Sequence, residues 1–123
     1  MSQLPDPAED RNVWFATVRP DGRPHLVPVW YVLEGDRWYV CMQANSVKAR
    51  NLQANSAVSL ALEDGNNPFV VEGQAQVIAK TPSVAEKFKA KYDWDIMSDD
   101  QYSQLVEVSV SRRLLGGSSG MEI

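Results

Sequence analysis

The chain has one cysteine and one histidine among its 123 residues, and both scarcities exclude classes of site. Cys41 has no partner for an intrachain disulfide, and its place in an apolar run predicts a buried thiol. With His25 as the single imidazole, few ligands are left for a transition-metal ion, so no metal site is expected. His25 lies at the start of an expected strand, where a structural role is favoured over a catalytic one.

Long apolar runs are also missing, and none approaches the length that spans a membrane. The acidic, proline-containing stretch 1–11 does not resemble a signal peptide, so a cytoplasmic location is the default expectation. A net charge of −4 and a pI of about 4.9 argue against a general nucleic-acid binder. No nucleophile elbow or phosphate-cradling loop is present, and we assign no catalytic side chain.

Alternating apolar and polar residues dominate the chain and predict a mainly β fold. The length is that of a single domain, 1–123, with a polar lead-in at 1–11 and a mobile tail at 116–123. Turn residues such as Gly22 and Gly35 separate consecutive strands and predict hairpins. Six antiparallel strands of this kind close into a small, Greek-key-like barrel. The expected strands are 13–19, 25–33, 37–42, 57–62, 69–79, and 105–110 or a little further.

Two helices interrupt the strands, with room for a third short one. The first, at 46–54, begins at Ser46, a good N-cap residue. The second begins at Thr81-Pro82, a pattern typical of an N-cap followed by proline at the first helical position. Helical spacing predicts both faces of this helix. The apolar stripe consists of Val84, Ala85, Phe88 and Tyr92. The expected solvated face consists of Lys87, Lys89 and Lys91.

Two strand residues predict departures from regular pairing. Gly73 predicts a bulge or bend, and Pro28 predicts a sheet edge or a local opening, because proline cannot donate to the ladder. An opening beside the flat side chain of Trp30 could receive a planar ligand. The competing interpretation places Trp30 and Tyr31 in the core or in an interface, and exposed aromatics such as Trp30 and Trp38 would suit an interface between subunits.

The helix expected at 46–54 has an unusual charge pattern. Lys48 and Arg50 lie within about its first turn, and no acid occurs between Asp36 and Glu63. The helix dipole disfavours cations at this end by roughly 0.3–1 kcal/mol each. A bound anion would reverse that penalty, because free backbone N–H groups and both cations would converge on it. Two interpretations stay open: a site for a small anionic ligand, or a solvated basic helix that caps the barrel.

Four short stretches, taken in their order and spacing, resemble a known family. Over 13–78, more than half of the chain, the sequence is similar to flavin-binding split-barrel proteins related to pyridoxamine 5′-phosphate oxidase. The stretches that carry the resemblance are TVRPDGRP at 17–24, PVWY at 28–31, KARNL at 48–52 and VEGQA at 71–75.

The resemblance implies a split barrel that forms a homodimer, with FMN bound in each of two grooves between the subunits. Lys48, with Arg50 nearby, would hold the phosphate, and Ser46 could add a hydroxyl. Backbone groups along 28–30 and 41–43 would hydrogen-bond the edges of the isoalloxazine ring. The residues expected to bind the cofactor are Pro28, Val29, Trp30, Cys41, Met42, Gln43, Ser46, Lys48, Arg50 and Asn51.

The expected function is that of a flavin-dependent oxidoreductase acting by hydride transfer on a small molecule that the sequence does not identify. Val47 stands where tight FMN binders of the family often have a basic residue. Leu26 and Tyr31 stand where the vitamin B6 oxidases supply Arg and Lys, so vitamin B6 oxidation is not expected. Three alternatives stay open: a reductase that uses the deazaflavin coenzyme F420 in the same site, a non-catalytic flavin-binding or sensing module, and a split barrel without a ligand.

Overall fold

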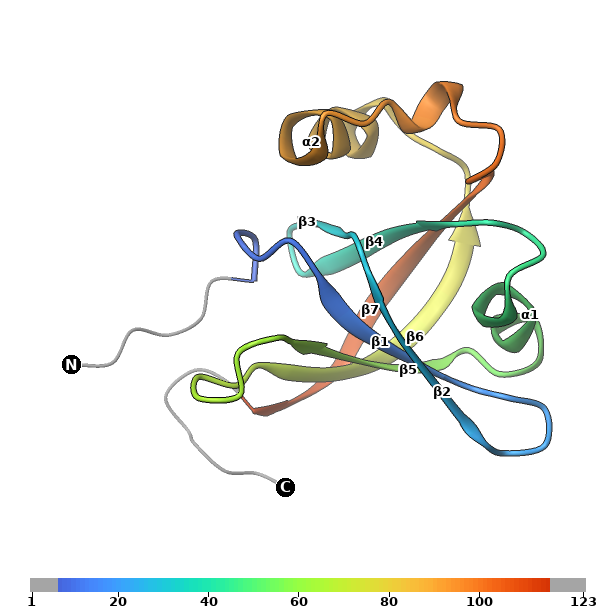
Figure 1. The fold of residues 1–123 in the computed structure, drawn as a ribbon, viewed down its shortest axis with the longest axis vertical. Coiled ribbons are helices and arrows are strands. Elements are labelled where there is room, and N and C mark those ends of the chain that lie inside the picture. Colours follow the sequence, from blue (N-terminus) through green and yellow to red (C-terminus); the bar gives the residue numbers. More distant parts are fainter. Residues whose placement is uncertain (1–6, 116–123) are drawn as a thin grey trace.

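The computed structural model describes residues 7–115, which form one strongly curled antiparallel sheet with helices at its rim (Figure 1). The expectation of a mainly β barrel with short helices is therefore confirmed, whereas the expected mobile tail at 116–123 lies outside the described residues. The elements are β1 (Val13–Val18), β2 (Pro24–Val29), β3 (Val32–Glu34), β4 (Arg37–Met42), α1 (Val47–Ala54), β5 (Ala57–Leu62), β6 (Val70–Ile78), α2 (Pro82–Tyr92), the 3-10 helix η1 (Ile96–Ser98) and β7 (Gln104–Leu115).

The sheet is split because its two edge strands are consecutive in the chain. The strand order is β2-β1-β5-β6-β7-β4-β3, so β2 and β3 lie at opposite edges although only Trp30 and Tyr31 separate them. The three steps from Val29 to Val32 reach roughly 10 Å, so the sheet must curl until its edges lie near each other. The result is a barrel that is open along one seam.

The expectation of a single strand at 25–33 is wrong, and the described residues form seven strands rather than six. The break falls at Trp30-Tyr31. There the backbone N–H of Tyr31 donates to the hydroxyl of Tyr92 at 3.0 Å instead of to a neighbouring strand. The side chain of Tyr31 is fully buried, and an inward turn of the chain at this point ends the ladder of β2.

Two apolar clusters hold the fold together, and β4 contributes to both. Trp38, Val40 and Met42 face the inside of the curled sheet. Tyr39 and Cys41 point the opposite way, into a second cluster formed with α2 and η1. A strand covered on both faces reads as a continuous apolar run, which explains the buried thiol predicted for Cys41. The expectation that Trp38 is exposed is wrong, because the barrel interior encloses it.

Helix α2 packs along this outer cluster through the predicted apolar stripe. Thr81 caps its N-terminus, and Asp93 ends it in the left-handed conformation. Lys91 was expected on the solvated face, and that expectation is wrong. Its ammonium group donates to the carbonyl of Tyr31 at 3.0 Å and lies 3.8 Å from the centroid of the Tyr31 ring, so it ties α2 to the break between β2 and β3.

Strands β6 and β7 form the longest pairing in the sheet. The register shifts between Glu72 and Gly73, which confirms the predicted bulge. Strand β7 continues past Val110, as the sequence allowed, and runs to Leu115 because β6 pairs with it along the whole of this length. Pro28 lies in the edge strand β2, as predicted for a residue that cannot donate to a ladder.

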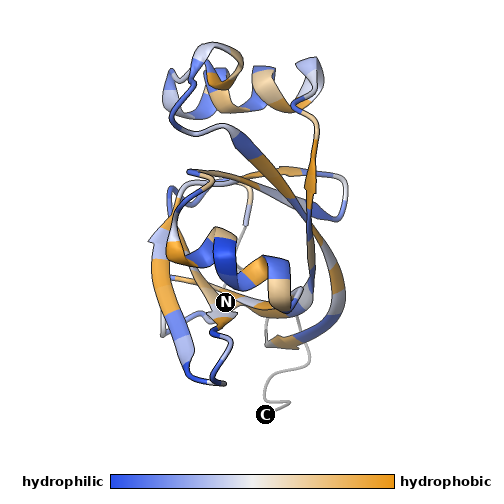
Figure 2. Cartoon of the chain, turned by 90° about the vertical axis from the view of Figure 1, so that its right-hand side faces the viewer, coloured by the Kyte–Doolittle hydropathy of each residue, from blue (hydrophilic) through white to orange (hydrophobic). Residues whose placement is uncertain are grey.

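Helix α1 lies across one open end of the barrel (Figure 2). Its N-cap is Ser46, whose hydroxyl accepts from the N–H of Ala49 at 3.2 Å. On its inner side the amide of Asn51 donates to the hydroxyl of Thr17 on β1 at 2.9 Å, and both residues are buried. This bond fixes the rotation of the helix and so decides which way Lys48 points. None of the helices within 7–115 has the length and apolar character needed to cross a membrane.

Candidate functional site

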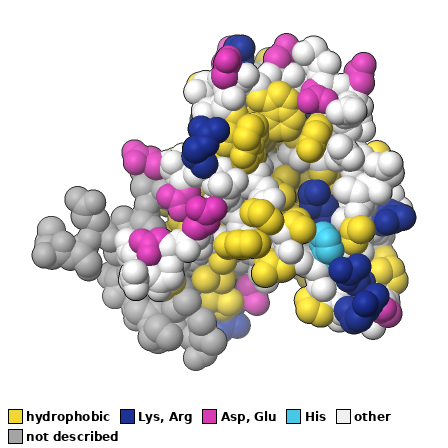
Figure 3. Space-filling view, in the orientation of Figure 1, with side chains coloured by type: hydrophobic (Ala, Val, Ile, Leu, Met, Phe, Trp, Pro, Cys, Tyr) yellow, Lys and Arg dark blue, Asp and Glu magenta, His cyan; other side chains and the backbone are white. Residues whose placement is uncertain are grey.

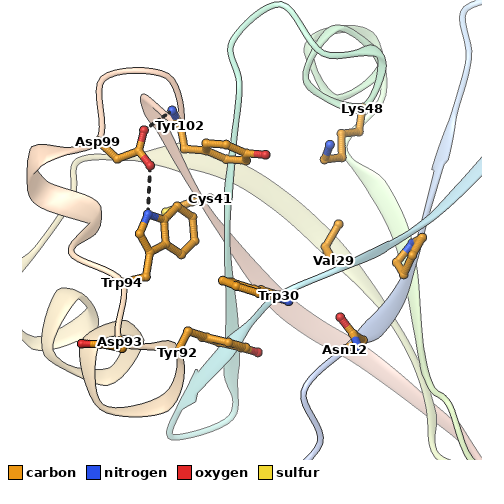
Figure 4. A pocket seen from close by; sticks show the side chains of 11 residues that line it. Asn12, Val29, Trp30, Cys41, Lys48, Tyr92, Asp93, Trp94, Asp99 and Tyr102 are labelled. Carbon is orange, nitrogen blue, oxygen red and sulfur yellow. Dashed lines mark hydrogen bonds between the residues drawn. The ribbon is translucent and has the colours of Figure 1, made fainter.

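A cleft of about 560 Å³ opens between the seam of the barrel and the α2 side of the molecule (Figures 3 and 4). This volume lies within the range of roughly 300–1,000 Å³ that is typical of small-molecule sites. The cleft is built by the end of β2, the end of β4, the first turn of α1, the end of α2, the segment that leads into β7, and the residue directly before β1. The lining residues are Asn12, Pro28, Val29, Trp30, Cys41, Lys48, Tyr92, Asp93, Trp94, Asp99 and Tyr102.

Lys48 is the cation of this cleft. It lies in the first turn of α1, which contains no acid, and its side chain points into the cleft (Figure 4). The side chain is half-buried, and burial lowers the pKa of its ammonium group. No carboxylate among the described residues forms an ion pair with it. A partly desolvated cation at a helix N-terminus is therefore positioned to receive an anion.

His25 lies in the same electropositive region. Burial lowers the pKa of its imidazole, and the charges of Arg19 and Lys48 lower it further, which keeps the ring neutral at pH 7. Its Nδ1 is buried and has no hydrogen-bond partner within 7–115. The histidine is flanked by Lys and Arg side chains in the space-filling view (Figure 3). The charges of Lys48 on α1 and of Arg19, directly after β1, thus act together on the region around His25, where they favour an anionic group.

Aromatic rings line the opposite end of the cleft. Trp30 stacks on Tyr92 with ring centroids 4.4 Å apart and planes 7° from parallel. The edge of Trp94 meets Trp30 at 5.9 Å, and Tyr102 meets Trp94 at 5.4 Å, nearly perpendicular. The guanidinium of Arg11 lies 4.8 Å from the ring centroid of Tyr92. Four rings from three segments therefore form a continuous wall.

Asp99 holds part of that wall in place. Its carboxylate accepts from the indole Nε1–H of Trp94 at 2.9 Å and from the backbone N–H of Tyr102 at 3.0 Å (Figure 4). These bonds, led by the one from Tyr102, lower the pKa of Asp99, so the carboxylate is charged at neutral pH. The ammonium of Lys80 donates to the backbone carbonyl of Asp99 at 3.1 Å. The segment is thus fixed at both its side chain and its backbone.

Cys41 forms part of the floor of the cleft without the properties of a nucleophile. Burial raises the pKa of its thiol to about 12, so almost no thiolate exists at neutral pH. Within residues 7–115 no group of three or more His, Cys, Asp or Glu side chains comes together to hold a metal ion. The chemistry that the cleft supports directly is the binding and orientation of a molecule with an anionic end and a flat ring.

Five of the ten residues that the sequence assigned to a cofactor line the cleft: Pro28, Val29, Trp30, Cys41 and Lys48. The others lie around it. Ser46 caps α1, Arg50 is exposed on the same helix, and Asn51 is bonded to Thr17. The side chain of Met42 is in the barrel core, and Gln43 is half-buried directly after β4.

Sequence reasoning missed the α2 side of the cleft. The residues that it did not assign are Asn12, Tyr92, Asp93, Trp94, Asp99 and Tyr102. Tyr92 was assigned to the apolar stripe of α2. Its side chain packs there as expected, and its ring also lines the cleft. The available signal was the density of aromatic and acidic residues in 92–102, but only the packing of α2 against β4 brings them opposite Trp30.

Comparison with protein families finds a match over residues 7–115 to the model described as pyridoxamine 5′-phosphate oxidase. Comparison with curated protein sequences finds no significant match.

Several solved structures share the fold. One is HutZ, described as a heme storage protein from Vibrio cholerae; it is 21% identical, with a TM-score of 0.76, and the match covers 94% of this chain and 92% of that one. An F420 reductase is 23% identical, with a TM-score of 0.66 and coverages of 93% and 96%. The conserved hypothetical protein Rv2991 from Mycobacterium tuberculosis is 28% identical, with a TM-score of 0.67 and coverages of 86% and 76%.

Proposed function

Because the chain belongs to the pyridoxamine 5′-phosphate oxidase family, we propose that it is a flavin-binding oxidoreductase that holds FMN in the cleft described above. A bound flavin supplies the hydride transfer, and the protein supplies binding, orientation and exclusion of water. Leu26 and Tyr31 do not provide the two cations expected of a vitamin B6 oxidase, so the proposed substrate is a different small molecule.

The observation that carries this proposal is the position of Lys48. Its ammonium group is half-buried in the cleft without an ion pair to any described carboxylate, and a cofactor phosphate would supply the missing charge. Arg50, exposed two residues further along α1, would add attraction that solvent screens. Backbone groups of 28–30 and 41–43 would meet the ring edges, and Ser46 would keep the helix N-terminus formed.

The deazaflavin coenzyme F420 is the second candidate cofactor. An F420 reductase shares this fold over nearly its whole length, and a phosphate in its cofactor would use the same cation. Absorption spectroscopy of the purified protein, before and after addition of each cofactor, separates the possibilities. Two visible bands that stay with the protein indicate FMN, and a single violet band indicates deazaflavin. A sharp Soret band would indicate heme and contradict the proposal.

The substitution Lys48→Ala should weaken cofactor binding by about 10- to 100-fold, the usual effect of losing one hydrogen bond to a charged group. The reason is that the phosphate would lose its buried cation while the helix keeps its cap. Fluorescence titration with FMN measures the affinity, and circular dichroism checks that the fold is kept. Lys87→Ala removes the same charge from the exposed face of α2 and should leave the affinity unchanged. Equal affinities of the two variants would refute the phosphate assignment.

His25 gives this test a readout that does not depend on turnover. It is the only histidine, so its ring protons can be followed by NMR during a pH titration. Lys48→Ala should raise the pKa of His25, because the charge of Lys48 lowers it. Binding of FMN to the unchanged protein should raise the pKa as well, since a phosphate near Lys48 favours the imidazolium form.

We also propose that the protein is a cytoplasmic homodimer that buries the outer face of β1 and β2. Cross-strand pairing places Trp14 opposite Pro28 and Ala16 opposite Leu26 on this face. Trp14 is 39% exposed and Leu26 is 57% exposed, so both present apolar surface to solvent on this face. The family relationship favours a second copy of this chain as the partner that covers this face.

The substitution Leu26→Asp should convert the dimer to a monomer, because it places a charge in the middle of an apolar contact. Light scattering coupled to size exclusion measures the mass of the particle. Ser83→Asp adds the same charge at an exposed position on α2 and should leave the mass at that of a dimer. A monomer in the unsubstituted protein would refute the homodimer.

A further inference from the structure

The aromatic end of the cleft contains more aromatic side chains than the packing of α2 requires. Phe88, Val84 and Ile96 are already buried between α2, η1 and the sheet. Trp30, in contrast, is 42% exposed although one face of its ring stacks on Tyr92. An indole that is covered on one face and open to the cleft presents a flat apolar surface to a ligand.

The rings around this surface are held rigidly. The hydroxyl of Tyr92 accepts from the N–H of Tyr31 and donates to the carbonyl of Arg11 at 2.7 Å. Trp94 and the backbone of Tyr102 are both bonded to Asp99. Aromatic side chains that are fixed before binding lose little conformational entropy when a ligand arrives. The wall is therefore preorganised for one shape, a flat ring.

The polar groups of this end favour a ring without negative charge. The carboxylate of Asp99 lines it, and the faces of aromatic rings repel anions because of their quadrupole. Asp93 is paired with Lys89 at 2.7 Å, and the guanidinium of Arg11, 5.6 Å from the Trp30 ring centroid, is a nearby cation that does not line the cleft. The hydroxyl of Tyr102 makes no hydrogen bond within residues 7–115, and in Figure 4 it points toward Lys48. A ligand at this end can therefore gain one hydrogen bond from Tyr102 in addition to stacking.

We propose that the wall formed by Trp30, Tyr92, Trp94 and Tyr102 binds the substrate of this protein, and that the substrate is a planar, uncharged aromatic compound with a polar substituent. This inference rests on the proposed function, since it names the substrate class of the same cleft. The two ends of the cleft then have different roles: the Lys48 end binds the phosphate of the cofactor, and the aromatic end binds the substrate ring.

The test uses 2-naphthol as the probe and the full chain labelled with ¹⁵N. The chain has four tryptophans, and each gives one indole N–H signal. We expect 2-naphthol to shift the signals of Trp30 and Trp94. The signal of Trp38, which is enclosed inside the barrel, serves as the internal control and should not move. No shift, or equal shifts of all four signals, would overturn the proposal.

Repeating the titration with saturating FMN separates this inference from the proposed function. Shifts of Trp30 and Trp94 that persist in the loaded protein support a substrate subsite. Loss of these shifts through competition would assign the aromatic end to the cofactor ring and overturn the proposal. If neither FMN nor the deazaflavin binds while 2-naphthol still does, the proposed function fails and the aromatic subsite stands.

Variants of Tyr102 test the stacking and the hydroxyl independently. Tyr102→Leu removes the ring and should weaken 2-naphthol binding about tenfold, and Tyr102→Phe removes only the hydroxyl and should weaken it about threefold. Met97→Ala changes an exposed side chain of η1 outside the cleft and should have no effect. Unchanged affinity in a folded Tyr102→Leu protein would overturn the proposal. If that variant does not fold, the tryptophan signals decide.

The charge preference is tested in the Lys48→Ala variant, which lacks the only cation among the described residues that line the cleft. There 2-naphthalenesulfonate should bind about tenfold more weakly than 2-naphthol, because its anionic group meets aromatic faces and carboxylates. Equal affinities would contradict the assignment of an uncharged substrate.

Discussion

The substitution Phe88→Ala should lower the free energy of unfolding by about 3–5 kcal/mol, the usual effect of removing a large aromatic side chain from a core. Phe88 is fully buried and has ring contacts to Tyr92 at 6.0 Å and to Trp94 at 5.5 Å. The neighbouring rings of Tyr92 and Trp94 do not shift readily into the space, because hydrogen bonds hold both. Urea denaturation measures the loss.

The matched control is Met97→Ala, which shortens an apolar side chain that is 52% exposed on η1. It should change the free energy of unfolding by no more than about 0.5 kcal/mol. Because Phe88 supports both Tyr92 and Trp94, its loss should also weaken binding of a planar ligand before the protein unfolds. A Phe88→Ala protein as stable as the control would contradict the view that α2 is anchored by this residue.

The second large effect is expected at Gly73, where Gly73→Ala should destabilise the protein by about 3 kcal/mol. A Cβ at this position would lie 2.3 Å from the backbone oxygen of Ser109 and 3.1 Å from Cγ1 of Val108. The obstacle is the backbone of β7, which cannot move aside without breaking the longest pairing in the sheet. Thermal unfolding followed by circular dichroism measures the change.

Gly65→Ala is the control for Gly73→Ala, because nothing lies within 4 Å of the Cβ it would add and its backbone is not left-handed. It should leave stability unchanged or raise it slightly by restricting the unfolded chain. If the Gly73→Ala and Gly65→Ala proteins had the same melting temperature, β6 and β7 could separate at the bulge without loss of stability.

Features that depend on local sequence could be predicted from it. Ser46 and Thr81 are N-caps because their side chains bond to N–H groups three residues along, and that pattern is contained in a few residues. The charge of Lys48 in an acid-free first turn is local in the same sense; it predicts an anion site at the start of the helix, and Lys48 lines the cleft. Pro28 at a sheet edge and Gly73 at a bulge follow from backbone chemistry alone.

Features that depend on distant partners could not be predicted. The strand break at Tyr31 requires the hydroxyl of Tyr92, which is 61 residues away. Lys91 is bound to the same distant segment. Helical spacing does not contain that partner, and it therefore assigned Lys91 to the solvated face. Trp38 follows a turn and seemed exposed, but the closed barrel places its ring 6.1 Å from that of Phe69. The aromatic side of the cleft exists only because α2 packs on β4.

The seam between β2 and β3 has a consequence for how this scaffold can change. Only Trp30 and Tyr31 join the two edge strands along the chain, and among residues 7–115 no strand pairing closes the gap between those edges. The width of the opening is therefore set by side-chain volume, whereas in a closed barrel it is fixed by strand number and stagger. Substituting a few side chains along the seam would resize the opening while every strand pair stays intact. Such a scaffold can acquire new ligands in single-residue steps.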